Sequence, residues 1–198
     1  MISAPVDTAP RAAQLLREAT HAAHRAVESL PMQQELSAGT LDRAGYATTL
    51  QRHHGLLARW ERDQSAWLSS LPAQGWTYRP RVPALQQDLA QLGASLDPVL
   101  AAPLQADNAA TRWGMLYVVE GSLLGGRVIA RQLRQHQPVL SGALAYFDLG
   151  SADPSLWRHF QQCLDTVLTD RAARQAAVEG AVAMFGQFHR HLSQETVQ

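Results

Sequence analysis

An arginine, a histidine and a glutamate share one side of a segment near the N-terminus, LREATHAAHRAVESL, which runs from Leu16 to Leu30. Successive residues of an α-helix turn by about 100°, so Arg17 and His24, two turns apart, lie almost in line, and Glu28 follows one turn later. A carboxylate at that place can accept the imidazole Nδ1–H and leave Nε2 free to bind a metal. The segment therefore offers a cation, an imidazole and a carboxylate in one strip.

The sequence indicates few kinds of metal site in which His24 could be a ligand. The sequence has no HExxH motif, a single cysteine and no cluster of carboxylates, so zinc or di-iron sites built from protein ligands are not indicated. If a metal is bound, one axial histidine on a porphyrin fits better. A lone histidine at a helix edge is nevertheless more often hydrogen-bonded or solvated, and its competitors are His21, His53, His54, His136, His159, His189 and His191.

Three glycines interrupt a second helical segment, YVVEGSLLGGRV. Each glycine inside a helix costs roughly 0.5–1 kcal/mol relative to alanine, so three within six residues need an explanation. Gly121 and Gly125 lie one turn apart and bare one strip of backbone, which Gly126 widens. Such a strip serves either the close packing of two helices or a flat, wide, apolar ligand pressed against the peptide groups. The glycines alone leave both explanations open.

Helical periodicity recurs along the chain, and strand-like alternation is nearly absent, so helices must position both segments. We predict a first helix from about Pro10 to Leu30 that Pro31 ends. Its expected buried stripe comprises Leu16, Ala19, Thr20, Ala23, Val27 and Leu30. The later helices are expected from a Thr40 cap to about Leu71, over PALQQDLAQL up to Gly93, from Ala109 to about His136, after an Asp153–Pro154 cap, and after Thr169 or Asp170. The segments GWTYRPRVP and LDPVLAAPLQADN are expected to be irregular.

Length and composition favour one all-α domain over 10–193, between a flexible N-terminus (1–9) and a C-terminal tail (194–198). The formal net charge of zero argues against a general nucleic-acid binder. No stretch approaches the ~20 apolar residues of a membrane span, and the first residues do not resemble a signal peptide. The single Cys163 excludes an internal disulfide framework and is expected to be a small buried hydrophobe. We therefore expect a cytoplasmic protein with neither a membrane nor a nucleic acid as partner.

Together, the two segments resemble a known family. LREATHAAHRAVE is similar to the proximal helix of the haem oxygenases, and YVVEGSLLGGRVI is similar to their distal helix. The order and separation of the motifs also fit, above all for bacterial biliverdin-forming members, including those linked to bacteriophytochromes. The resemblance implies a single-domain, haem-oxygenase-like all-α fold in which haem is sandwiched between the proximal and distal helices.

Carried over residue by residue, the resemblance makes His24 the proximal ligand of the haem iron and Glu28 the carboxylate that orients it. Arg17 falls where the family has a basic residue near a haem propionate. The remaining positions carried over are Gly121, Gly125 and Gly126 as the distal glycines beside the haem, Tyr117 near one propionate, and Arg158 with His159 for the other. Where mammalian-type members carry an aspartate that organises water around oxygen, this sequence has Ser122, whose hydroxyl can hold water but not charge.

The resemblance further implies that haem b is both cofactor and substrate and that O2 is the co-substrate. Cleavage at a meso carbon, α by the family default, would give biliverdin, carbon monoxide and iron. The chain holds no glycine-rich dinucleotide fingerprint, so electrons must come from a ferredoxin or a flavoprotein reductase. A bacteriophytochrome is a candidate acceptor of the biliverdin. Two other functions remain open: a haem-binding or haem-trafficking protein without turnover, and a thiaminase-like relative of the same architecture without haem.

Overall fold

The computed structural model describes residues 11–96, 99–151, 153 and 155–193. The predicted terminal segments 1–9 and 194–198 lie outside these residues, as do Pro10 and Pro154. All regular secondary structure in the described part of the chain is helical, which confirms the all-α prediction. The helices are α1 (Ala12–Glu28), α2 (Pro31–Ala38), α3 (Arg43–Asp63), α4 (Ser65–Ser70), α5 (Val82–Gln91), α6 (Ala109–His136), α7 (Ala145–Asp148), α8 (Leu156–Val167) and α9 (Arg171–Leu192), with 3-10 turns η1 (Leu71–Gln74) and η2 (Pro138–Leu140).

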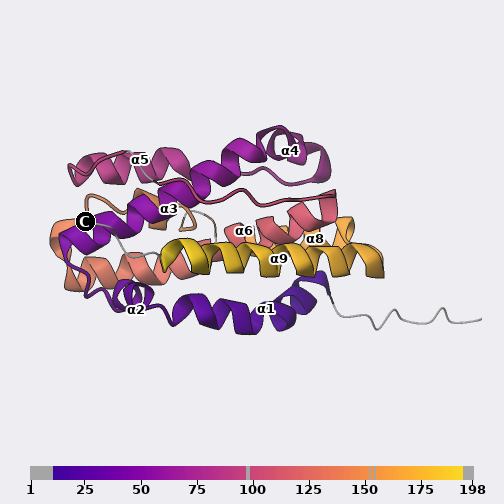
Figure 1. The fold of residues 1–198 in the computed structure, drawn as a ribbon, viewed down its shortest axis with the longest axis horizontal. Helices are drawn as coiled ribbons and strands as arrows, with labels where there is room; N and C mark the ends of the chain where they lie inside the picture. The colour runs from indigo at the N-terminus through magenta and orange to yellow at the C-terminus, as the bar shows by residue number, and fades with distance from the viewer. Residues whose placement is uncertain (1–10, 97–98, 152, 154, 194–198) are drawn as a thin grey trace, which may run out of the picture.

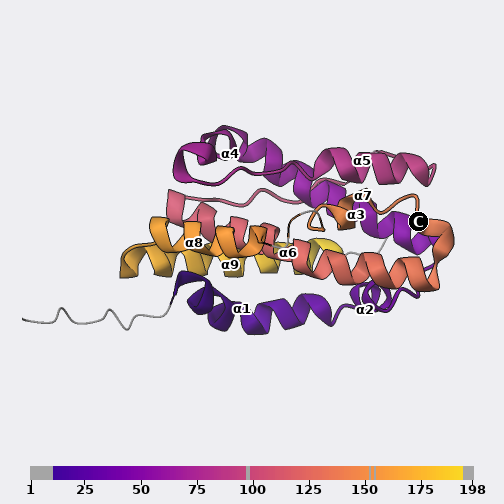
Figure 2. The same cartoon turned by 180° about the vertical axis from the view of Figure 1, so that it is seen from behind.

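The helices form three layers (Figures 1 and 2). α6, α8 and α9 make up the middle layer, with α3, α4 and α5 on one side and α1 and α2 on the other. α9 packs along both α6 and α1, so it joins the helix that carries His24 to the helix that carries the glycines. No described helix combines the length and the apolar character that crossing a membrane requires.

The predicted bounds of α6 are confirmed at both ends. Asn108 caps it, because its side chain accepts a hydrogen bond from Thr111 N at 2.9 Å. Asp170 rather than Thr169 caps α9 by accepting from Ala173 N. Gly93 ends the α5 region with φ +62°, and the segment from Gly75 to Arg81 is irregular, both as predicted.

The first two predicted helices were too long. Pro31 does not end a helix but begins α2, because a proline at the first position loses no intrahelical hydrogen bond. Thr40 does not cap α3; Asp42 does, accepting from Gly45 N at 2.7 Å, while the Thr40 hydroxyl bonds back to Glu35 O. α3 ends at Asp63, and α4 and η1 follow it up to Leu71 and beyond.

The buried stripe of α1 was predicted correctly only near its start. Leu16 and Thr20 are buried, whereas Ala23, Val27 and Leu30 are half-buried and Ala19 is exposed. The second half of α1 therefore contributes little to the core, and its outward side chains are available for contacts with something other than protein.

α6 and α9 approach each other with almost no side chain between them. A Cβ placed on Gly114 would lie 1.8 Å from Ala177 O, and one on Gly180 would lie 2.1 Å from Thr111 O. We expect Gly114→Ala to destabilise the protein by about 3 kcal/mol or more, since overpacking of this kind cannot relax without separating the backbones. Gly125→Ala in the same helix is the matched control, because its Cβ would meet no atom within 4 Å. That variant should gain roughly 0.5–1 kcal/mol of helix propensity. Urea denaturation measures both, and equal stability of the two variants would contradict the close crossing.

Candidate functional site

The imidazole of His24 stands in the open on α1. Its side chain is 53% exposed, and that of Glu28, one turn later, is 61% exposed. Glu28 Oε2 lies 3.6 Å from His24 Nδ1, on the ring edge where the sequence predicted a carboxylate. This distance is too long for a hydrogen bond but places the carboxylate beside the correct nitrogen. Nε2 is therefore the ring atom left to face an incoming ligand.

α9 supports the same imidazole from the side. The ring of His24 meets that of Phe185 edge-on, with centroids 5.4 Å apart and planes at 76°. Val182, one turn earlier on α9, is exposed. Phe185 and Val182 therefore give α9 an apolar surface beside His24.

The three glycines of α6 have three different surroundings. Gly125 faces open space, since a Cβ there would meet nothing within 4 Å. A Cβ on Gly121 would lie 3.5 Å from the ring of Trp157. A Cβ on Gly126 would lie 3.1 Å from Phe147 O, so Gly126 is needed for close packing against α7. Close packing therefore explains Gly126, whereas it does not explain Gly125, for which the ligand explanation stays a prediction.

The open side of α6 is apolar. Leu124 and Val128 are both exposed, and they lie on the same side of the helix as Gly121 and Gly125. Large apolar side chains exposed together in this way commonly mark a binding surface for an apolar partner. Bare backbone and aliphatic side chains present no charge to whatever lies against them.

Arg17 of α1 and Tyr117 of α6 are both predicted propionate contacts. Burial raises the pKa of the Tyr117 phenol, and the positive charge of Arg17 opposes that shift. The Tyr117 ring also packs on Trp157, with centroids 5.6 Å apart. Arg158, the next residue of α8, is exposed, whereas the His159 ring contacts Trp76 at 5.7 Å.

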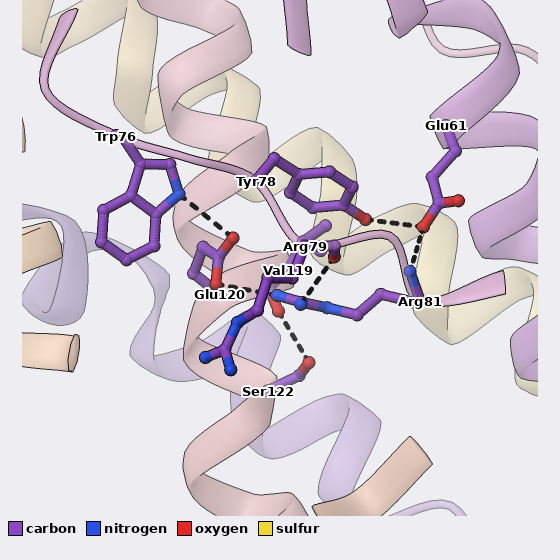
Figure 3. Close-up of polar contacts among 8 residues, drawn as sticks. All are labelled: Glu61, Trp76, Tyr78, Arg79, Arg81, Val119, Glu120 and Ser122. Carbon is purple, nitrogen blue, oxygen red and sulfur yellow. Dashed lines mark hydrogen bonds and ion pairs between the residues drawn. The ribbon is translucent and has the colours of Figure 1, made fainter. Parts of the chain in front are cut away.

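Glu120, which precedes the first glycine, points away from the open side and into the protein. Arg81 donates to Glu120 Oε2 at 2.8 Å and Trp76 Nε1 donates to Oε1 at 3.3 Å (Figure 3). Burial raises the pKa of Glu120, and the Arg81 guanidinium partly offsets this. The carboxylate is thus committed to a structural ion pair, and it does not replace the charge that Ser122 lacks.

The partners of Glu120 lie in a segment that the sequence marked only as irregular. Glu61 of α3 accepts from the Tyr78 hydroxyl at 2.9 Å and from Arg81 N, which fixes this segment on the other side (Figure 3). Two arginines and two aromatic residues within six positions of a proline-containing loop, WTYRPR, were the available signal for a buried anchor.

Within the described residues no group of three or more histidine, cysteine, aspartate or glutamate side chains is placed to hold a metal ion. A family model described as "Heme oxygenase" matches residues 10–194. The chain belongs to the haem oxygenase family. The family predicted from the proximal and distal motifs is confirmed, and the protein is an enzyme that cleaves haem.

Relatives of this haem oxygenase agree in sequence and in fold. A heme oxygenase from Xanthomonas campestris pv. campestris (strain 8004) is 52% identical over 164 residues, which are 83% of this chain and 98% of the relative. The heme oxygenase structure from Leptospira interrogans superposes with a TM-score of 0.75 at 18% identity, covering 93% of this chain and 99% of that one. Heme oxygenase-1 of Synechocystis sp. PCC6803, solved in complex with heme, gives a TM-score of 0.69 at 17% identity and covers 92% and 91% of the two chains.

Proposed function

We propose that this cytoplasmic haem oxygenase binds haem b between α1 and α6, with His24 as the axial ligand of the iron. The observations that support the proposal are the exposed imidazole of α1 with Glu28 beside its Nδ1, and the apolar face of α6 on which Gly125 meets open space. A flat, wide, apolar molecule with one iron fits these residues, since they offer one nitrogen ligand and a wall without side chains. A cage built only from protein ligands has no counterpart among them.

The residues around this surface bind different parts of the substrate. Glu28 stabilises the Nδ1–H form of His24 and so keeps Nε2 available as a neutral ligand. Arg17 and Tyr117 bind one propionate through charge-assisted and phenolic hydrogen bonds, and Arg158 serves the other. These contacts fix the rotation of the porphyrin in its plane and thereby select the meso carbon, which we propose to be α.

The distal wall determines the kind of oxidation. Bound haem supplies the iron at which O2 is reduced and the porphyrin carbon that is oxidised. Gly121 and Gly125 place peptide groups against the ligand, and the Glu120 carboxylate is held away from it by its ion pair with Arg81. Ser122 is exposed beside Gly121 and can hold water. Electrons come from a ferredoxin or a flavoprotein reductase, and we propose a bacteriophytochrome as the acceptor of biliverdin.

The experiment that tests the proposal is a titration of the purified protein with hemin followed by addition of ascorbate or a ferredoxin–reductase system. A stoichiometric Soret band that disappears while biliverdin absorption grows, with release of carbon monoxide, is the expected result. A stable Soret band under reducing conditions would instead indicate haem binding without turnover. No stoichiometric Soret change would exclude haem as the ligand.

Filling the space at Gly125 should block the site without harming the fold. Gly125→Leu is expected to weaken hemin binding by roughly 5- to 150-fold, which corresponds to the 1–3 kcal/mol that overpacking commonly costs. The haem-free variant should be at least as stable as the parent, since a Cβ at this position contacts nothing within 4 Å. Soret titration and urea denaturation give the two quantities. Unchanged hemin affinity and turnover would remove Gly125 from the binding wall.

A further inference from the structure

The imidazole of His24 has a neighbour besides Glu28, the ring of Phe185 on α9. The two ring centroids lie 5.4 Å apart and the planes cross at 76°, so the rings meet edge to face. α1 and α9 pack along each other, and both views of the fold show them side by side (Figures 1 and 2). An edge-to-face contact is favourable for aromatic rings, because the positive edge of one ring meets the negative face of the other.

Glu28 alone leaves one rotation of the imidazole free. The histidine side chain turns broadly about its Cβ–Cγ bond and is not confined to narrow rotamer wells. Glu28 Oε2 lies 3.6 Å from Nδ1, and both side chains are more than half exposed, so this contact is weak. It also acts on a single ring atom, and the ring can still turn about the line from that atom to the carboxylate. A second contact, away from that line, is needed to fix the plane of the ring.

Phe185 is held firmly enough to supply this second contact. Its side chain is half-buried and packs against the hydrophobic core, and the preceding Met184 is buried. α9 itself is fixed on α6, since a Cβ on Gly180 would lie 2.1 Å from Thr111 O. Phe185 therefore relates the plane of the His24 ring to α6, the helix that carries the glycines.

We propose that Phe185 is a positioning residue that fixes the rotation of the His24 imidazole plane; this inference rests on the proposed function. Glu28 determines which ring nitrogen carries the proton, and Phe185 determines how the ring is turned about its Cβ–Cγ bond. An imidazole already held in its binding orientation loses less conformational freedom when iron binds to Nε2. The plane of a fixed axial imidazole also distinguishes two perpendicular directions of a porphyrin, whereas a freely turning ring does not.

Three variants of α9 separate this role from general packing. Phe185→Leu removes the ring but keeps an apolar side chain, and Phe185→Tyr keeps the ring. Phe188→Leu is the matched control, because it removes a ring one turn later, which lies 6.3 Å from the ring of His53 instead of beside His24. We expect Phe185→Leu to weaken hemin binding by roughly 2- to 10-fold, the range that loss of an aromatic pair commonly gives. Phe185→Tyr and Phe188→Leu should bind hemin like the parent.

The orientation of the ring is read from the haem methyl ¹H NMR shifts of the low-spin cyanide complex, because these shifts depend on the plane of the axial imidazole. A hemin in which methyl groups replace both vinyl groups is two-fold symmetric, so haem bound in the flipped orientation adds no second set of signals. With this hemin, Phe185→Leu should change the spread and order of the methyl shifts, while Phe185→Tyr and Phe188→Leu reproduce the parent. Parent-like shifts in Phe185→Leu would overturn the inference.

The biliverdin isomer distinguishes action through His24 from direct contact with haem. A side chain that itself holds the porphyrin would influence its rotation in the plane, and with it the meso carbon that is cleaved. A side chain that acts through the imidazole leaves this choice to the propionate contacts. We therefore expect Phe185→Leu to form the same isomer as the parent. A different isomer would make Phe185 a contact of the haem itself and would overturn its role as a positioning residue.

The haem-free protein gives a measurement that does not need the substrate. Nuclear Overhauser cross-peaks should join the ring protons of Phe185 to those of His24 in the parent and in Phe188→Leu, since the two rings are in contact. Their absence would overturn the inference while the proposed function stands. A hemin spectrum that is the same in the parent and in His24→Ala would instead refute His24 as the ligand in the proposed function, and this inference with it, even where the ring contact is observed.

Discussion

Replacing His24 with alanine is expected to abolish haem turnover and to change the axial-ligand spectrum of the hemin complex. The exposed imidazole is the proposed ligand of the iron, and Glu28 Oε2 lies 3.6 Å from its Nδ1. The loss should exceed the roughly 10- to 100-fold that removal of a residue supporting a metal ligand typically costs, because here the ligand itself is removed. Soret and visible spectra of the hemin complex and the rate of biliverdin formation measure the effect. Added imidazole should restore a six-coordinate or histidine-like spectrum.

His21→Ala is the matched control for this prediction. His21 is exposed on the same helix, one turn before His24, so its loss removes the same chemical group without touching the proposed ligand. We expect its spectrum and turnover to equal those of the parent. Both variants should unfold at the parent's urea concentration, since neither imidazole belongs to the core. A spectrum that changes in His21→Ala and not in His24→Ala would move the axial ligand.

Replacing Arg81 with methionine is expected to cause a large loss of stability. Arg81 and Glu120 are almost completely buried, and their ion pair sits directly before Gly121. Removal of one partner leaves a buried, unpaired carboxylate, which commonly costs about 3–5 kcal/mol. Urea denaturation of the haem-free protein at pH 8 measures this loss.

The loss should depend on pH in a defined direction. Burial already raises the pKa of Glu120, and without Arg81 nothing comparable opposes it. A carboxyl group whose folded pKa lies above its unfolded value, near 4.3, contributes stability at low pH that is lost as the pH rises through the folded pKa. Arg81→Met should therefore be closer to the parent at pH 5 than at pH 8. A deficit that grows toward acid would contradict this account of the pair.

Two further variants give this prediction its controls. The double variant Arg81→Met, Glu120→Met should recover most of the lost stability, because apolar residues of similar volume leave no charge buried. Arg134→Met breaks the exposed ion pair with Asp148 and should change stability by about 1 kcal/mol or less. A double variant as unstable as Arg81→Met alone would show that packing rather than charge dominates at this place.

The sequence predicted the elements that carry the site better than it predicted their environments. α6 begins and ends where the periodicity placed it, because apolar spacing is a local property. The bounds of α1 failed because proline suits a helix start as well as a helix end, and only the tertiary packing shows which of the two occurs. Local patterns also cannot reveal which side of a helix the core covers, so Ala19 was wrongly expected to be buried.

The roles of the three glycines could not be predicted from the sequence for the same reason. One sequence motif, GSLLGG, contains a residue facing open space, a residue against Trp157 and a residue against the backbone of α7. Their spacing reveals that backbone is bared, but the neighbours that meet it come from α7 and α8, more than twenty residues away. The Arg81–Glu120 pair was missed for the same reason, since it joins segments that no local pattern relates.

The uneven anchoring of α1 affects the exchange of substrate for product. The buried residues of this helix all precede His21, so the part that carries the ligand is held mainly by lateral contacts such as that with Phe185. Haem is rigid and flat, whereas an opened tetrapyrrole is flexible and takes another shape. α1 has buried residues at its start and is followed by α2, which packs on α6, so we expect its exposed middle to yield when the substrate is exchanged for the product.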